Sequence, residues 1–291
     1  MKCVISGGTG FIGRRIVDRF RAAGHSVDSW SRKSLATFHW DPLTGEPSLE
    51  SLEGMDAVLH LAGEPVAQRW NGAVKQRIRD SRVFGTRRLV DAIAKVSNRP
   101  RLLVAASAIG IYGDRGDEIL NESSGPGAGF LAEVCRAWEA EAERAAQFGL
   151  RVVKLRIGFV LGKDGGALGQ MLPVFRLGLG GPLGSGKQWM PWIHADDVAG
   201  LFLHAATTGI SGVWNATAPN PVTNADFTRA LAKAIHRPAI FPVPPFALKL
   251  LFGELAQHML DSARVVPEAA LKAGFRFRFP EIGGALEDLL G

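Results

Sequence analysis

Three glycines near the amino terminus have the spacing of a loop that binds a diphosphate. Gly7, Gly10 and Gly13 follow the apolar run Val4–Ser6 and precede an amphipathic segment, Arg14–Ala23, which predicts a strand, a tight turn and a helix. The first glycine permits the turn, the second lets a pyrophosphate approach the backbone, and the third lets the helix pack on the strand. The free amides and positive dipole end of the helix then bind the anion without a charged side chain. The alternative is a glycine turn with a structural role alone. The expected ligand contacts are Gly7, Thr9, Gly10, Phe11, Ile12 and Gly13.

The residues at the end of the second expected strand, Ser26–Ser31, select the dinucleotide. An acidic residue there would bind a ribose 2′-hydroxyl group. Ser31, followed by Arg32 and Lys33, instead suits a 2′-phosphate through charge-assisted hydrogen bonds. Asp28 is acidic but lies too early in the strand to reach the ribose edge. The sequence therefore predicts NADP(H), and the alternative is a pair of solvated surface cations.

Small residues follow the third expected strand. Asp56–Gly63 predicts a strand that runs into a turn of small residues. Large side chains in this turn would collide with a dinucleotide that crosses the carboxyl edge of the sheet. A long helix is expected over about 67–96, and its Gly85 is small enough for close contact with the sheet. Arg82 of this helix could reach the pyrophosphate, although a lone arginine is more often exposed. The expected contacts from the turn are Leu61, Ala62, Gly63 and Glu64.

Two further strands must carry the reacting end of the site. Arg101–Ser107 is apolar enough to be a central strand and runs into Ser107–Gly113, which contains the single tyrosine, Tyr112. Phe130–Phe148 has the apolar spacing of a helix that packs on the sheet. Arg151–Leu161 is a fifth strand, and its residues Arg156 and Gly158 are expected near the nicotinamide.

A change in composition after Gly162 predicts a second lobe. Glycines interrupt the chain from Lys163, and the alternation of strands with long helices stops. We expect an NADP(H)-binding domain over 1–162, completed by about 196–217, and a small carboxyl-terminal lobe over 163–195 and 218–291. Phe246–Leu260 is an amphipathic helix with few cations, so packing within the lobe is favoured over a membrane surface.

Composition excludes several classes of protein. The chain of 291 residues is 46% apolar, which is enough for a large core. It lacks an uncharged apolar run of membrane-spanning length, and Met1 and Lys2 lead directly into the first strand, so we expect a cytoplasmic protein with no membrane partner. Cys3 and Cys135 lack disulfide or metal-ligand patterns, so no metal is expected. The net charge of +6 reflects cations gathered in Arg69–Arg101, where a solvated helix face is favoured over nucleic-acid binding.

Together, these motifs resemble the extended short-chain dehydrogenase/reductase superfamily, and more closely its atypical branch of epimerase-like proteins. The resemblance spans nearly the whole chain and implies an α/β fold: a doubly wound Rossmann sheet of about seven strands, a small mixed lobe closing over it, and NADP(H) in the crevice with Arg82 at the pyrophosphate. Besides the glycine loop, it rests on Leu61–Pro65, Arg69 and Trp70, Ser81–Thr86, Ser107–Gly113, Phe130–Cys135, Trp138 and Glu139, Leu155–Gly162, Trp192–Asp197 and Pro244–Leu290.

The sequence departs from the superfamily where catalysis normally takes place. The usual proton relay is a tyrosine with a lysine four residues later, which lowers the pKa of the tyrosine and holds the nicotinamide ribose. Counting back from the end of the helix places the tyrosine at Phe130 or Leu131 and the lysine at Val134 or Cys135. Neither alignment supplies a phenol or an amine, so the resemblance implies an atypical site.

Three residues remain as catalytic candidates, each with a structural alternative. Ser107 matches the serine or threonine that contacts a substrate oxygen, unless the register places Ala108 there. Tyr112 is a substitute acid or a packing residue, and Cys135 is a nucleophile or a small core residue. His194 titrates near neutral pH but more often such a residue caps a helix, and the neighbouring Asp197 is expected to cap helix 197–207.

The sequence therefore predicts an NADP(H)-dependent oxidoreductase or epimerase-like enzyme acting on a small carbonyl, alcohol or sugar nucleotide. The substrate is expected between Ser107, Glu64, Trp192 and the glycine-rich loop 163–188. The alternative is a dinucleotide-binding sensor that has lost catalysis. The oligomeric state stays open, with a homodimer as one candidate.

Overall fold

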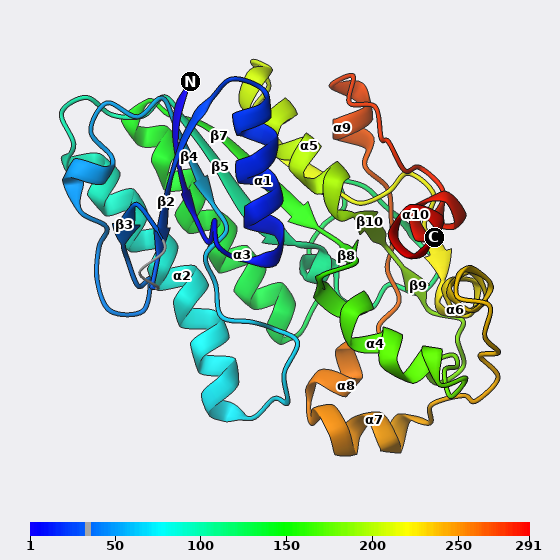
Figure 1. Cartoon of the computed structure of the whole chain (residues 1–291). Coiled ribbons are helices and arrows are strands. Elements are labelled where there is room, and N and C mark those ends of the chain that lie inside the picture. Colours follow the sequence, from blue (N-terminus) through cyan, green and yellow to red (C-terminus); the bar gives the residue numbers. More distant parts are fainter. Residues whose placement is uncertain (33–35) are drawn as a thin grey trace.

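A seven-stranded parallel sheet forms the centre of the molecule (Figure 1). The computed structural model describes residues 1–32 and 36–291. The strands of this sheet are β1 (Lys2–Ser6), β2 (Ser26–Ser31), β3 (Phe38–His39), β4 (Ala57–His60), β5 (Leu102–Ala108), β7 (Arg151–Ile157) and β11 (Gly212–Ala216). Their order is β11-β7-β5-β4-β1-β2-β3, and all neighbouring pairs are parallel.

The order of the strands creates a crevice between β1 and β4. The chain winds outward from β1 to β3, returns to β4 on the other side of β1, and continues to β11. This reversal is the switch point of a doubly wound fold, where ligands bind beyond the carboxyl ends of the strands. The predicted Rossmann fold is confirmed.

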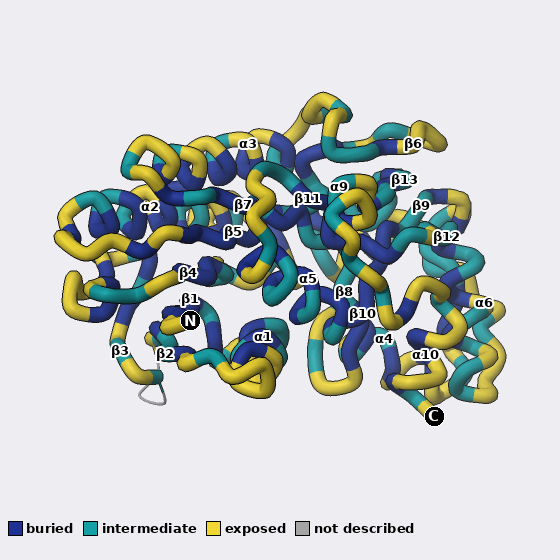
Figure 2. Tube along the Cα trace, turned by 90° about the horizontal axis from the view of Figure 1, so that it is seen from above, coloured by how far each residue is buried: buried dark blue, intermediate teal, exposed yellow. Residues whose placement is uncertain are grey.

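Two helices cover each face of the sheet (Figure 2). On one face α1 (Phe11–Ala22) packs against α5 (Ala195–Thr207), and on the other α2 (Gly72–Lys95) packs against α3 (Phe130–Glu143). Helix α1 buries Ile16 and Phe20 and exposes Arg14, Arg19 and Arg21, as its 3- and 4-residue apolar spacing requires. Asn71 begins α2 by accepting a hydrogen bond from the Val74 amide.

Three expected elements are broken in the structure. The strand predicted over 151–161 is interrupted at Gly158, because the next segment, β8 (Phe159–Gly162), pairs with β10 (Trp192–His194) outside the central sheet. The last residue of β7 in the central sheet is Ile157, five residues before the expected boundary at Gly162. Phe130–Phe148 ends as an α-helix at Glu143 and continues as a 3₁₀ turn, η3 (Arg144–Phe148).

The third broken element is the helix expected over 246–260. It forms two short helices, α7 (Pro245–Phe252) and α8 (Leu255–His258), because Gly253 between them has φ of +63°. Within α7 only Leu248 is buried, so the expectation that this helix packs into the lobe is wrong for most of its surface.

The carboxyl-terminal lobe is small and mixed, as predicted. Its remaining pairs are β9 (Trp189–Met190) with β12 (Val222–Thr223) and β6 (Ile119–Leu120) with β13 (Arg264–Val265). The other helices are α4 (Gly166–Arg176), α6 (Asn224–Ala234), α9 (Glu268–Lys272) and α10 (Ile282–Leu290), and short 3₁₀ turns are η1 (Leu49–Ser51) and η2 (Ile109–Tyr112). Across the described residues, no helix has the length and apolar character needed to cross a bilayer.

Two residues at the start of α5 join the lobe to the sheet. His194 caps the helix, because its Nδ1 accepts a hydrogen bond from the Asp196 amide at 3.1 Å. Asp197 was expected to cap it but does not. Its buried carboxylate instead accepts hydrogen bonds from the amides of Arg278 and Phe279 at 2.8 and 3.0 Å, which fastens the last part of the chain to α5.

Candidate dinucleotide site

A cleft of about 260 Å³ lies at the carboxyl ends of β1, β2 and β4. This is the switch point of the sheet, where the fold predicts a nucleotide site. The segments that line the cleft are far apart in sequence and are brought together by the parallel strands. Its lining includes Ser6, Gly7, Thr9, Gly10, Trp30, Ser31, Arg32, Trp40, Asp41, Pro42, Leu43, Leu61, Ala62, Gly63, Glu64, Pro65 and Ser81.

The glycine loop fits a diphosphate. Gly7 adopts φ of +75°, which favours glycine, and a Cβ at Gly13 would lie 2.1 Å from the Gly7 carbonyl oxygen. Helix α1 therefore packs directly on the loop. No side chain caps the first turn of α1, so the amides there face the crevice as an anion site. Phe11 contributes its backbone to this turn, while its ring packs against Gly162 and Gly165.

The end of β2 forms one wall of the cleft. The hydroxyl groups of Thr9 and Ser31 lie 3.3 Å apart, and the exposed Arg32 also lines the cleft. This position suits recognition of a 2′-phosphate by the guanidinium. Lys33, the other predicted cation, lies outside the described residues. Asp28 pairs in register with Val4, well before the end of the strand.

A segment that the sequence did not single out forms the opposite wall. Trp40, Asp41, Pro42 and Leu43 follow β3 and line the cleft. The expected close contact of Gly85 with the sheet is wrong, because a Cβ there would meet Pro42 at 2.7 Å. The absence of a side chain at Gly85 thus lets Pro42, in the wall of the cleft, pack closely against α2.

Arg82 lies just behind the segment that follows β4, and its contact with a pyrophosphate stays a prediction. Its Nη1 donates to the carbonyl oxygens of Glu64 and Ile78 at 3.0 and 3.2 Å, and its guanidinium lies 5.2 Å from the centre of the Trp138 ring. A Cβ at Gly63, in the lining, would lie 3.1 Å from that guanidinium. Burial lowers the pKa of Arg82. No carboxylate in residues 1–32 and 36–291 forms an ion pair with Arg82, although the charge of Glu64 acts in the opposite direction to burial and raises the pKa of Arg82.

A buried histidine supports the floor of the cleft. The Nδ1 of His60 lies 2.7 Å from the Ser6 hydroxyl, and its Nε2 lies 3.0 Å from the Thr86 hydroxyl. Ser6 also accepts hydrogen bonds from the amides of Leu61 and Ala62, both at 3.0 Å. Burial, and then the charge of Arg82, lower the pKa of His60 to about 3. We assigned no role to His60 from sequence, because a histidine in an apolar strand carries no distinct signal.

Ser107 and Tyr112 belong to one buried polar network. Ser107 donates to Glu139 at 2.6 Å, and Arg156 binds both carboxylate oxygens of Glu139 at 2.8 and 2.9 Å. Arg156 also donates to the Tyr112 hydroxyl at 2.9 Å, and that hydroxyl donates to Asn215 at 2.8 Å. These contacts give the side chains a structural role, and their contact with a ligand stays a prediction.

Cys135 is buried in an apolar cluster that lies beside charged side chains. Burial, and then the charge of Glu139, raise the pKa of its thiol to about 12, so the thiolate is scarce at neutral pH. It packs in a cluster with Ile111 and Leu120. These observations favour the core-residue alternative over a nucleophile.

Two other predicted residues face packing neighbours. A Cβ at Gly158 would lie 2.4 Å from the Pro191 carbonyl oxygen, so the glycine allows the two backbone segments to pack closely. This packing explains the glycine without a cofactor contact. Trp192 was expected beside the substrate but is fully buried in the core of the lobe, where its indole donates to the Asn220 carbonyl at 3.1 Å. That expectation is wrong.

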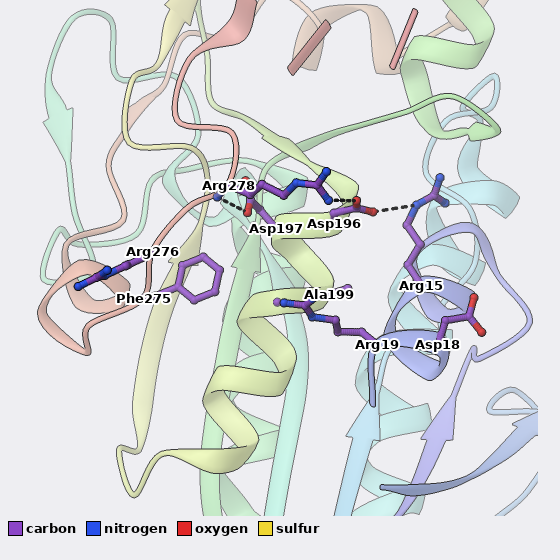
Figure 3. A pocket seen from close by; sticks show the side chains of 10 residues that line it. Arg15, Asp18, Arg19, Asp196, Asp197, Ala199, Phe275, Arg276 and Arg278 are labelled. Atoms are coloured by element: carbon purple, nitrogen blue, oxygen red, sulfur yellow. Dashed lines mark hydrogen bonds and ion pairs between the residues drawn. The ribbon is translucent and has the colours of Figure 1, made fainter. Parts of the chain in front are cut away.

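A second pocket, of about 330 Å³, lies between α1, α5 and the segment 275–278 (Figure 3). Figure 3 shows Asp196 between Arg15 and Arg278, and the ion-pair distances are 3.7 and 3.4 Å. The pocket therefore neutralises part of its own charge, and it lacks the glycine loop and the strand ends that define a dinucleotide site.

Comparison with known proteins gives two family matches. A model described as the NAD dependent epimerase/dehydratase family matches residues 3–216, and a domain of unknown function, DUF1731, matches residues 243–289. The second match agrees with the predicted extra carboxyl-terminal unit.

Several relatives match along the whole chain. The epimerase family protein SDR39U1 of Bos taurus is 40% identical over 298 residues, with both chains fully covered. The chloroplastic SDR39U1 homologue of Arabidopsis thaliana is 40% identical, and the match covers all of this chain and 87% of the relative. The crystal structure of human SDR39U1 with NADPH has a TM-score of 0.90 and 36% identity, and it covers 100% of this chain and 99% of the human one.

Proposed function

Because this chain belongs to the NAD dependent epimerase/dehydratase family, we propose that it is an NADP(H)-dependent enzyme acting on a small carbonyl, alcohol or sugar-nucleotide substrate. One observation carries the proposal: a cleft at the switch point has an uncapped helix terminus, and the guanidinium of the half-buried Arg82 lies directly behind Gly63 of its lining. These groups complement a dinucleotide diphosphate.

The cofactor is NADP(H). The similar human protein was crystallised with NADPH, and an exposed cation in the lining of the cleft, Arg32, supports recognition of a 2′-phosphate. The amides at the start of α1 and the guanidinium of Arg82 bind the diphosphate, while Leu61–Gly63, directly after β4, supports the adenosine half. When bound, the cofactor supplies a hydride to a carbonyl or accepts one from an alcohol.

Glu64 is the group that we assign to proton handling. Ser107 and Tyr112 are engaged in the buried network, and Cys135 is protonated at neutral pH. The Glu64 side chain is 14% exposed in the lining of the cleft, where its carboxylate lies 3.4 Å from Arg77 Nε. A carboxyl group beside the cleft can donate or accept the proton that accompanies hydride transfer. Arg77 would hold this carboxylate in place.

A sensor that binds the dinucleotide without turnover is the second candidate. It is favoured by the apolar residues Phe130, Leu131 and Val134 in the usual relay positions and by the burial of the three predicted catalytic side chains. The two candidates share the cofactor site and differ in the fate of the hydride.

Turnover measurements separate the two candidates. Purified protein is given NADPH with a panel of aldehydes, ketones and nucleotide sugars, and oxidation of NADPH is followed by absorbance. The enzyme proposal expects turnover at saturating NADPH that falls at least about a hundredfold in Glu64→Gln. The control Glu133→Gln changes an exposed carboxylate on α3 and should leave the rate unchanged. Tight NADPH binding with no turnover on any substrate would instead establish the sensor.

A further inference from the structure

We propose that the end of the small lobe formed by α4, the segment 237–243 and α7 docks on an anionic lipid surface. We call this surface the lobe tip. The proposal is independent of the reaction at the dinucleotide cleft, because it rests on residues outside that cleft. It also differs from a membrane span, because the elements involved lie along the surface of the lobe.

The lobe tip exposes large apolar side chains. On α7, Phe246 is 75%, Leu250 73% and Leu251 62% exposed. More than half of the large hydrophobic side chains that are exposed in the described part of the chain lie in α4, the adjoining loops and α7. Such a concentration on a folded surface marks a site of interaction. The most exposed members are Leu177, Leu179, Ile240, Phe246, Leu250 and Leu251.

These side chains come from segments that lie next to one another. The Phe241 amide donates to the Gly180 carbonyl at 3.1 Å, so the chain after α4 lies along the chain before α7. Gly178 lies close to Pro238, and a Cβ there would be 3.5 Å from the proline ring. Helix α7 then begins at Pro245, and it lies below α4 at the edge of the lobe in Figure 1. The segments that carry these side chains are therefore neighbours at one end of the lobe.

The charges of these segments have a single sign. Residues 165–195 and 227–253 contain no aspartate or glutamate. Arg176 ends α4, Arg237 donates to the Arg176 carbonyl at 3.2 Å, and Lys249 is exposed on α7, so these cations flank the apolar side chains. Apolar side chains that enter the acyl boundary, together with cations that meet the headgroups, are the features of an interfacial anchor. The complementary surface is therefore a bilayer rich in anionic lipid.

Shape and charge disfavour other occupants. Helix α7 projects three side chains that are more than 60% exposed, so it presents a convex edge, whereas a peptide helix needs a groove. A two-fold dimer through the lobe tip would bring the same patch of both copies together and place like charges opposite each other. A lipid surface accommodates the convex apolar edge and neutralises the cations.

Vesicle flotation with the full-length protein tests the proposal. Vesicles of phosphatidylcholine mixed with phosphatidylglycerol should carry the protein upward, and vesicles of phosphatidylcholine alone should bind it far more weakly. Neutralising two cations in R237Q/K249Q should weaken binding about thirtyfold. Replacing two apolar side chains in L250S/L251S should weaken it about a hundredfold or more.

A matched variant provides the control. L271S/K272Q alters an exposed leucine and lysine on α9, at the opposite end of the lobe from α7 in Figure 1, and should bind vesicles as the unmodified protein does. Unchanged NADPH affinity in each variant shows that the fold is kept. The proposal is overturned if the unmodified protein fails to float with anionic vesicles, if both vesicle types bind it equally, or if L250S/L251S binds normally. It is also overturned if the protein is a dimer that L250S/L251S converts to monomers.

Discussion

Replacing Arg82 by methionine should separate ligand binding from folding stability. The guanidinium is desolvated and no carboxylate lies within ion-pair distance of it in the described protein, so we expect the diphosphate of the cofactor to supply its counterion. A hydrogen bond to a charged partner is worth about 1.5–3 kcal/mol, which predicts a loss of NADPH affinity of about 10- to 150-fold. Methionine keeps apolar contact with Trp138. Because the loss of two bonds to carbonyl oxygens is offset by removal of a buried charge, the unfolding free energy should change by less than about 1 kcal/mol.

The assay for Arg82→Met combines two measurements on the same preparation. Fluorescence titration gives the dissociation constant for NADPH, and urea denaturation without cofactor gives the unfolding free energy. Arg79→Met, on an exposed position of the same helix, is the control and should change neither quantity. A large loss of stability with unchanged NADPH affinity would refute the reasoning, because Arg82 would then be a structural residue.

Three further predictions concern other parts of the site. Gly13→Ala places a Cβ 2.1 Å from the Gly7 carbonyl oxygen, so it should lower the unfolding free energy in urea denaturation by about 1–3 kcal/mol and weaken the binding of NADPH in titration. In the control Gly283→Ala the added Cβ meets open space, so neither the unfolding free energy nor the affinity for NADPH should fall. The pKa of His60 is lowered to about 3 in the folded protein, so the stability that its neutral form contributes is complete above pH 6.5 and is lost at lower pH, where only the unfolded chain binds a proton. Urea denaturation should therefore give an unfolding free energy about 2 kcal/mol lower at pH 5 than at pH 7.5. An equal pH dependence in the His60→Gln variant would contradict this. Because burial raises the pKa of the Cys135 thiol, its alkylation by iodoacetamide at pH 8 should be slow until the protein unfolds. The Cys135→Ala variant should keep whatever turnover the unmodified protein shows. Rapid alkylation of Cys135 in the folded protein would restore the nucleophile hypothesis.

The glycine loop and the strand ends were predictable because their chemistry is local. The requirement for a tight turn at Gly7 and close packing at Gly13 depends on residues adjacent in sequence. The bounds predicted for the second strand, Ser26–Ser31, agree with β2, and Arg32 follows it at the cleft. The parallel order of the sheet then brings these local features together.

Long-range packing set the limits of sequence prediction. Gly158 breaks the fifth strand because Pro191, far along the chain, approaches it, and no local pattern announces that contact. The wall at Trp40 and Pro42 depends in the same way on the absence of a side chain at Gly85 of α2. Tyr112 carried an apparent chemical signal, but its hydroxyl is held by Arg156 and Asn215 from other strands. The residue type shows which reactions a side chain could take part in, but its tertiary contacts determine whether it is free to do so.

The affinity of the protein for NADPH relative to NADH tests the central claim most directly. Fluorescence titration of the unmodified protein and of Arg32→Glu with both cofactors measures the four dissociation constants. A charge-assisted contact between Arg32 and the 2′-phosphate predicts that the unmodified protein binds NADPH about ten- to a hundredfold more tightly than NADH, and that Arg32→Glu loses this preference mainly by weakening NADPH. Equal affinity of the unmodified protein for the two cofactors, or binding of neither, would contradict the account.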